Sequence, residues 1–377
     1  MRKMAAVGAL CLLLAGCWDR REIEERANVL ALGVDACELP CKVRITRQVA
    51  IPGRIPLGGI QEGGGAKEDV EPVAIVTSDG ADAPTALARA QAKLNHRLTF
   101  AHLRVLLMGE AFAQQGLTEY LDVVRRTPEI RRLMWLVVVE GQAEDVVRAR
   151  PRLEMVPALF LSDMLEDAVK SGRLPFSNFG QFLTQVANKG EQPTAPLLKM
   201  AGPDRVSLAG LAVFHEGRMV GRLSPEEAAT YMQLRGYRRG GELIRLTLPD
   251  GSQADLTVYG RETRYQVATA GRQFQVHITM HLETDLLRSS SDLDIQNPRT
   301  LERIETQAAR KVKSEAEALV QKLQRQWQAD ILGVGERVRA YLPRAWAATP
   351  NWSVAFAEAQ FAVDVQVNVR QTGLSAH

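Results

Sequence analysis

The sequence has few of the features on which catalysis, nucleic-acid binding and membrane spanning depend. Its 377 residues carry a net charge of only +3, which argues against a dedicated nucleic-acid-binding protein. It contains neither a Gly-x-Ser-x-Gly nor a His-Glu-x-x-His motif, so the usual hydrolase turn and metalloprotease helix are missing. After Cys17, no apolar run is long enough to cross a bilayer. These absences disfavour a hydrolase, a DNA-binding protein and a multi-pass membrane protein.

The histidines also lack the arrangement that chemistry would need. His277 and His281 are predicted to share one strand face, about 13 Å apart at ~3.3 Å per residue, which is too far for one metal ion. His96 and His102 bracket the end of a predicted helix, and no nucleophile is evident beside either of them. We therefore expect structural histidines, no catalytic residue and no metal site.

The first residues have the layout of a lipoprotein signal peptide. A positive segment, Met1-Arg2-Lys3, precedes an apolar run that ends in Leu14-Ala15-Gly16-Cys17, which has the form of a lipobox. Removal of residues 1–16 would leave Cys17 able to carry a diacylglycerol on its sulfur and an acyl chain on its amine. Two or more chains anchor a protein stably, because each buried CH2 contributes roughly 0.8 kcal/mol. The sequence therefore predicts lipidation at Cys17 and attachment to the outer face of a membrane, with these lipids as the only cofactor.

A charged segment follows the anchor directly and allows two interpretations. It contains Trp18, Asp19, Arg20 and Arg21. Each arginine near anionic lipid is worth on the order of 1 kcal/mol, which the acidic neighbours partly offset. The segment is therefore either a solvated stretch beside lipid headgroups or a contact with a membrane partner.

Cys37 and Cys41 are the two cysteines left once Cys11 is removed with the signal and Cys17 is lipidated. They flank a turn, so in an oxidising compartment they form either a disulfide or two free thiols. A zinc site would need two more ligands, and none stands at a suitable spacing.

The N-terminal half, residues 17–200, mixes strands and helices. Alternating apolar residues predict strands at 27–35 and 42–51, an α/β unit occupies about 70–150, and 151–200 is mostly helical. Between them, the glycine-rich 58–65 segment predicts a mobile loop, and it lacks the Gly-Lys-Ser/Thr of a phosphate loop. The length predicts two or three domains.

The C-terminal half, residues 205–377, has the clearest periodicity. A hairpin and a helix are predicted over 206–240, and a sheet with one long helix over 243–377. The helix opens at Asn297-Pro298 and keeps an apolar stripe to Ile331; alternating strands precede and follow it. We expect an α+β, multi-domain protein with mixed or antiparallel sheets packed by helices, ending in an antiparallel sheet. The polar face of this helix is either solvated or a partner surface; its cations are Arg310, Lys311, Lys313, Lys322 and Arg325.

Short motifs follow one another along the chain in a specific order. Cys17-Trp18-Asp19-Arg20-Arg21-Glu22-Ile23 is followed by Ala31-Leu32-Gly33-Val34-Asp35. Further along stand Phe100-Ala101-His102-Leu103, Pro128-Glu129-Ile130-Arg131, Gly210-Leu211-Ala212-Val213-Phe214, Val220-Gly221-Arg222-Leu223-Ser224, Ala329-Asp330-Ile331-Leu332-Gly333 and Arg370-Gln371-Thr372-Gly373. In this order they resemble the Ger(x)C spore germination lipoproteins, the C subunits of nutrient germinant receptors.

The resemblance implies a non-enzymatic subunit on the outer face of the inner spore membrane. Its expected partners are a multi-pass A-type subunit and a transporter-like B-type subunit that senses nutrients. It also implies three α/β-type domains, and it assigns a functional role to Cys17 alone. The Cys37/Cys41 pair and the glycine-rich 58–65 loop depart from the family pattern. The alternative function is a lipid-anchored extracytoplasmic solute-binding protein, which would hold a small molecule between domains.

Overall fold

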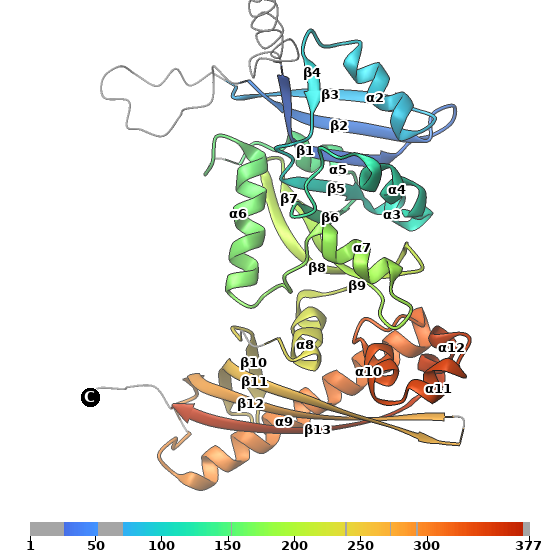
Figure 1. Cartoon of the computed structure of the whole chain (residues 1–377). Helices are drawn as coiled ribbons and strands as arrows, with labels where there is room; N and C mark the ends of the chain where they lie inside the picture. The colour runs from blue at the N-terminus through green and yellow to red at the C-terminus, as the bar shows by residue number, and fades with distance from the viewer. Residues whose placement is uncertain are drawn as a thin grey trace, which may run out of the picture.

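The computed structural model describes residues 26–51, 71–151, 153–237, 240–271, 273–291 and 293–371. Two β-sheets follow one another along an elongated molecule, with the first sheet in the upper half of Figure 1 and the second in the lower half. None of the described helices is both long and apolar enough to span a membrane.

The first sheet is mixed, with parallel strands at its centre and antiparallel strands at both sides. Its path is β3-β2-β1-β5-β6-β7-β8-β9, and β4 (Arg97–Thr99) pairs with the start of β1. Strands β1, β5, β6 and β7 are mutually parallel. The path strands span β1 Arg26–Ala36, β2 Val43–Ala50, β3 Val73–Gly80, β5 Val105–Gly109, β6 Trp135–Glu140, β7 Thr194–Gly202, β8 Arg205–His215 and β9 Arg218–Leu223.

Helices cover both faces of this sheet, because its central strands are apolar on both sides. All five residues of β5 are buried, and so are the first five of β6. One face packs against α2 Ala83–Gln91, α3 Glu110–Gln115, α4 Thr118–Arg126 and α7 Phe179–Ala187. The other packs against α5 Ala143–Arg148, α6 Pro157–Lys170 and α8 Pro225–Arg235.

The second sheet has four strands and one long helix on its inner face. The strands are β10 Leu243–Thr247, β11 Gln253–Ala270, β12 Gln273–Ser289 and β13 Gln360–Gln371. Helix α9 (Pro298–Lys322) buries Ile304, Ala308, Val312 and Ala316 against it. A π-helical turn, η4 (Leu323–Trp327), ends α9, and α10 Val334–Tyr341, α11 Pro343–Ala347 and α12 Trp352–Glu358 follow.

The predicted α+β, multi-domain class is confirmed, as is the start of the long helix after Asn297. The helix ends earlier than its apolar stripe indicated, because Gln328 adopts a left-handed conformation after η4 and Ile331 lies in the following turn. One detail of the last sheet is wrong, because β13 runs parallel to β12 and only β10, β11 and β12 are antiparallel. Alternation in the sequence indicates which residues face the core, but not the direction of the strand. The long connection through α9 to α12 brings the chain back beside the start of β12, which makes a parallel pairing possible.

The division expected between residues 200 and 205 falls at the turn between β7 and β8. These two strands are hydrogen-bonded neighbours in the first sheet. Strands β8 and β9 and helix α8 therefore pack with the first sheet, although they lie in the C-terminal half of the sequence.

Candidate functional site

The residues predicted for membrane attachment lie outside the described part of the structure. These are Cys17, Trp18, Asp19, Arg20 and Arg21, and the glycine-rich 58–65 loop is also outside it. Lipidation and partner contact at these positions therefore stay predictions.

Cys37 and Cys41 lie together just beyond the end of β1. The structure pairs them as a disulfide, with Cα atoms 5.6 Å apart. With Asp79 they form a group of three potential metal ligands within 4.8 Å of one another, but the Asp79 carboxylate is held by Arg44 at 2.8 Å. The ion pair leaves that carboxylate less available to a metal. The bond stays a prediction, and thiol alkylation with and without reductant would test it.

The Ala31–Asp35 motif has a structural role at the N-terminus of α5. The buried carboxylate of Asp35 accepts hydrogen bonds from the backbone N–H groups of Ala143 (2.6 Å) and Glu144 (2.9 Å). Burial raises the pKa of Asp35 despite these two donors. A side chain at Gly109 would collide with the same carboxylate. The motif thus fixes α5 on the first sheet and contributes no reactive group.

The interdomain joint, where the segment 188–193 meets 329–336, connects the two sheets. The Asp330 side chain is 1% exposed and accepts three hydrogen bonds, from the backbone N–H groups of Val334 and Gly335 and from Trp352 Nε1. The Asp330 carbonyl accepts a fourth from the N–H of Gln192 at 2.8 Å. Burial raises the pKa of Asp330. One residue therefore closes the turn before α10 and attaches it to the first domain.

An arginine and two glycines complete the interdomain joint. Arg235, at the end of α8, forms a 2.9 Å ion pair with Glu191 and donates to the carbonyl of Ile331. Gly335 lies against the backbone of Gly190, and a Cβ on either residue would come within 2.8 Å of neighbouring atoms. The backbones can approach this closely only because both positions are glycine.

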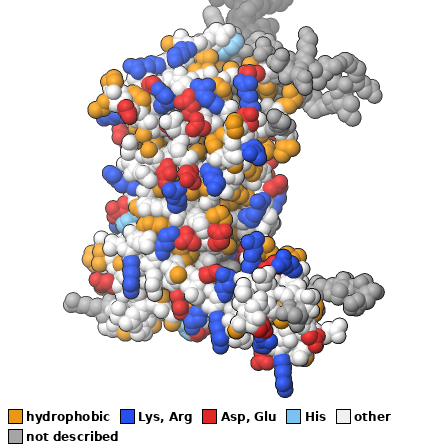
Figure 2. All heavy atoms as spheres, turned by 180° about the vertical axis from the view of Figure 1, so that it is seen from behind, with side chains coloured by type: hydrophobic (Ala, Val, Ile, Leu, Met, Phe, Trp, Pro, Cys, Tyr) orange, Lys and Arg blue, Asp and Glu red, His pale blue; other side chains and the backbone are white. Residues whose placement is uncertain are grey.

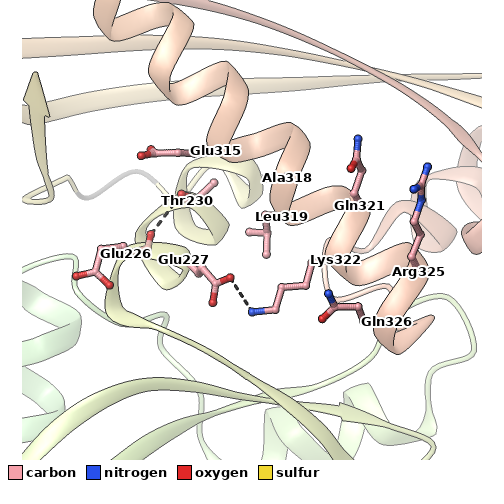
Figure 3. Close-up of a pocket in the computed structure, with 10 residues that line it drawn as sticks. All are labelled: Glu226, Glu227, Thr230, Glu315, Ala318, Leu319, Gln321, Lys322, Arg325 and Gln326. Atoms are coloured by element: carbon pink, nitrogen blue, oxygen red, sulfur yellow. Dashed lines mark hydrogen bonds and ion pairs between the residues drawn. The ribbon is translucent and has the colours of Figure 1, made fainter. Parts of the chain in front are cut away.

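A polar groove of about 430 Å³ lies beside the joint, between the first turn of α8 and the end of α9 (Figure 3). Ser224 and Glu227 form a capping box that starts α8, the helix predicted within 206–240. Glu227 also forms a 2.6 Å ion pair with Lys322 of α9, across the mouth of the groove. The Lys322 ammonium lies 4.8 Å from the centroid of the Trp327 ring. Two cations of the predicted polar helix face, Lys322 and Arg325, therefore lie in a groove between elements.

The ring of Trp327 sets the distance between β9 and the π-helical turn. It lies so close to Gly221 of β9 that any Cβ at that position would overlap the ring. Gly221 and Asp330 both belong to motifs singled out in the sequence. Their contacts were not predictable, because each partner is distant in the chain.

A histidine of the first domain and a serine of the second domain also contact each other. His215 Nε2, at the end of β8, and Ser353 Oγ, in α12, are 3.0 Å apart and separated by 138 positions in the chain. Within the described ranges, no carboxylate is hydrogen-bonded to the other nitrogen of His215, so the orienting group of a catalytic triad is missing there. The contact links the domains. His277, for its part, lies 2.8 Å from Asp364 on the outer face of the second sheet.

The molecular surface is mixed in charge on the side drawn in Figure 2. Basic and acidic side chains are interspersed over the length of the molecule on that side. Such a surface produces no strong electrostatic field of one sign on that side.

Two family models match consecutive parts of the chain. They are described as the spore germination protein N-terminal domain, over residues 19–200, and as the spore germination B3/GerAC-like C-terminal domain, over residues 209–373. Among curated proteins, the chain is similar to spore germination protein KC of Bacillus subtilis (strain 168), with 24% identity over 96% of this chain and 93% of the relative. It is also 23% identical to the putative spore germination protein YfkR of that organism, over 97% of this chain and 95% of the relative.

A solved structure has the same fold. The crystal structure of the GerBC protein matches with a TM-score of 0.60 at 18% identity, and the match covers 90% of this chain and 96% of that one. The α+β arrangement of two sheets and their helices is thus shared with a known structure.

Proposed function

Because the chain belongs to the Ger(x)C family of spore germination proteins, we propose that it is the lipid-anchored C subunit of a nutrient germinant receptor. Its role is non-enzymatic, and it is required for germination in response to nutrients. It is held on the outer face of the inner spore membrane by lipids on Cys17. Its partners there are the A-type and B-type membrane subunits.

The interdomain joint is the observation that supports a structural subunit. Motifs shared with the family contribute Asp330, which is hydrogen-bonded within the joint, and Gly221, which packs against Trp327 between the two domains. Residues used in this way hold two domains in one arrangement, which suits a structural role. A body of fixed shape is what an extracellular scaffold needs in order to present two surfaces at once.

The start of β1 limits how far the first sheet could lie from the proposed anchor. β1 begins at Arg26, and the segment from Cys17 reaches about 30 Å when fully extended. An anchor at Cys17 would thus hold the first sheet close to the membrane surface and within reach of membrane-embedded partners.

The test is a Cys17→Ala substitution expressed in the spore, with Cys11→Ala as its matched control. Cys11 lies in the apolar part of the signal, so its loss should leave anchoring intact. We expect Cys17→Ala to move the protein out of the membrane fraction and to impair nutrient germination, while Cys11→Ala behaves as wild type. Normal germination of Cys17→Ala spores, with the protein soluble, would refute the anchored-subunit proposal.

A further inference from the structure

The α7 groove is defined here as the two hollows that flank helix α7, of about 660 Å³ and 680 Å³. Both hollows are lined by Arg132, Gly180 and Thr184, so they form one surface on either side of the helix. In Figure 1, α7 lies between α4 above and the α10–α11 pair below. The groove therefore crosses from the first domain to the second.

The helix within the groove presents a neutral, polar face. An Asn178–Gln181 capping box starts α7, and Phe179 and Phe182 anchor its inner side in the core. The sequence of α7, FGQFLTQVA, contains no charged residue. Its outer side exposes Gln181 and Thr184. The Gln181 amide oxygen accepts from the Asn178 N–H and the Thr184 hydroxyl donates to the Gly180 carbonyl, which leaves the Gln181 NH2 group as a donor and the Thr184 oxygen as an acceptor for a ligand. Such groups suit the backbone of an extended peptide.

Around this neutral helix, every charged side chain that lines the groove is basic. The cations come from α4, the 127–134 segment, the loop after α7, the end of α8, and α10; they are Arg125, Arg132, Lys189, Arg235 and Arg339. Neither hollow has an aspartate or a glutamate among its lining residues. The groove thus concentrates one sign of charge on a protein whose net charge is only +3.

Acidic neighbours outside the lining neutralise only part of this charge. Arg125, Arg235 and Arg339 form ion pairs with Asp122 (2.6 Å), Glu191 (2.9 Å) and Glu336 (2.6 Å) respectively. Arg132 and Lys189 form no ion pair with any residue that the structure describes, and both are exposed.

These two side chains therefore give the groove a surplus of positive charge. Arginine binds carboxylates bidentately, so Arg132 is the stronger recognition element of the two.

One end of the groove adds exposed apolar side chains. Leu133 is 77% exposed and Phe176 is 52% exposed, and both line the hollow that contains Arg235. Phe176 is held in place by an edge-to-face contact with Trp135 at 5.9 Å. At the other end, the Trp346 ring lines the second hollow. Aromatic side chains and arginine are enriched at protein–protein interfaces, so Phe176, Trp346 and Arg132 suit a binding surface.

We propose that the α7 groove binds an acidic, partly apolar peptide segment of a partner protein. Carboxylates of the segment pair with Arg132 and Lys189, and its leucine-like side chains pack on Leu133 and Phe176. Its backbone lies over Gln181 and Thr184. A lipid bilayer fits less well, because its flat surface cannot enter two hollows. This inference does not depend on the lipid anchor.

The experiment measures binding of a short fluorescent peptide of glutamate and leucine to the purified full-length protein by fluorescence anisotropy. A peptide of lysine and leucine is the charge-reversed probe, and phosphatidylglycerol vesicles are the lipid probe. We expect the acidic peptide alone to bind, and we expect its affinity to fall as salt rises. Removing both surplus cations in Arg132→Gln/Lys189→Gln should weaken binding by about tenfold or more, the effect of lost charge-assisted hydrogen bonds.

A double variant elsewhere on the surface serves as the matched control. Arg310→Gln/Lys199→Gln removes the same two positive charges from exposed positions outside the groove. This control should bind the acidic peptide as the wild type does, and both doubles should keep the wild-type melting temperature. The proposal would be overturned if the acidic peptide did not bind, or if both double variants weakened its binding equally. It would also be overturned if vesicles bound through Arg132 and Lys189 and the peptide did not. The Cys17→Ala result is separate, because localisation does not involve the groove.

Discussion

Asp330 and Arg47 show how differently two buried charges can be accommodated. Asp330 accepts hydrogen bonds from three donors, so its charge is compensated in place. Arg47, also 1% exposed, donates from Nη1 to the Ile45 carbonyl and the Ser78 hydroxyl. Its Nε has no hydrogen-bond partner within the described part of the chain, and none of its bonds is to a carboxylate. Burial opposes both charges, but the Asp330 carboxylate has hydrogen-bond donors to both of its oxygens, whereas the Arg47 guanidinium is only partly compensated.

Replacing Asp330 by alanine should destabilise the protein strongly. The change leaves three buried N–H donors without an acceptor, which costs about 3–5 kcal/mol in the free energy of unfolding. Asp163→Ala is the control, because Asp163 is exposed on α6. Urea denaturation of both variants measures the difference. A loss below about 1 kcal/mol at Asp330 would show that the joint does not depend on this carboxylate.

Replacing Arg47 by methionine should stabilise the protein or leave its stability unchanged at neutral pH. Burial lowers the pKa of Arg47 to about 10, well below its ordinary value, so the unfolded chain holds this proton more tightly than the folded one. The wild type therefore gains stability as pH rises above about 10, and Arg47→Met should lack this gain. Chemical denaturation at neutral and alkaline pH tests both statements. A destabilised variant would mean that the hydrogen bonds of Arg47 outweigh its burial.

At this scale the sequence identified residues but not their contacts. The proximity of Cys37 and Cys41 follows from a short loop, whereas the link between Asp330 and Gln192 joins segments far apart in the chain. Arg132 and Lys189 belonged to no recognisable pattern, because α7 itself is uncharged and the cations around it come from five separate segments.

A close contact with β9 constrains the geometry at the end of α9. The π-helical turn places the Trp327 ring on Gly221, where no side chain fits. Gly221→Ala should therefore cost about 1–3 kcal/mol through overpacking. In a Trp327→Ala background the same substitution should cost much less, because the obstruction is gone. A double-mutant cycle measures this coupling. If the free-energy losses of Gly221→Ala and Trp327→Ala simply added, the cost of Gly221→Ala would not come from contact with the Trp327 ring.

Elements with a regular apolar period were predictable, and irregular ones were not. The Asn297-Pro298 start of α9 and the Ser224 capping box before α8 match the structure, because these are local signals. Strand β7 was missed, because Pro196 looks like a break. In the structure, Pro196 immediately precedes the three residues of β7 that pair with β6. The parallel direction of β13 was missed because it depends on the path of the long α9–α12 connection, which the alternation within the strand does not reveal.

For the whole molecule, we expect the two sheets to unfold in one transition. A single hydrophobic cluster extends from Ala31 in β1 through Tyr231 in α8 to Val367 in β13. Because this core crosses the interdomain joint, neither sheet can lose its packing alone. Calorimetry should give equal van't Hoff and calorimetric enthalpies. Two separate transitions in the wild type would contradict a shared core.

The parallel pairing of β12 with β13 also bears on how the protein is made. β13 is synthesised after every element that it contacts. β12 and α9 therefore emerge from the ribosome before the strand that pairs with the edge of β12 exists. The second domain can therefore close only once synthesis has passed residue 371, and a chain stopped before Gln360 would expose an apolar strand edge. Newly made chains thus need protection from aggregation until their last strand is available to pair with β12.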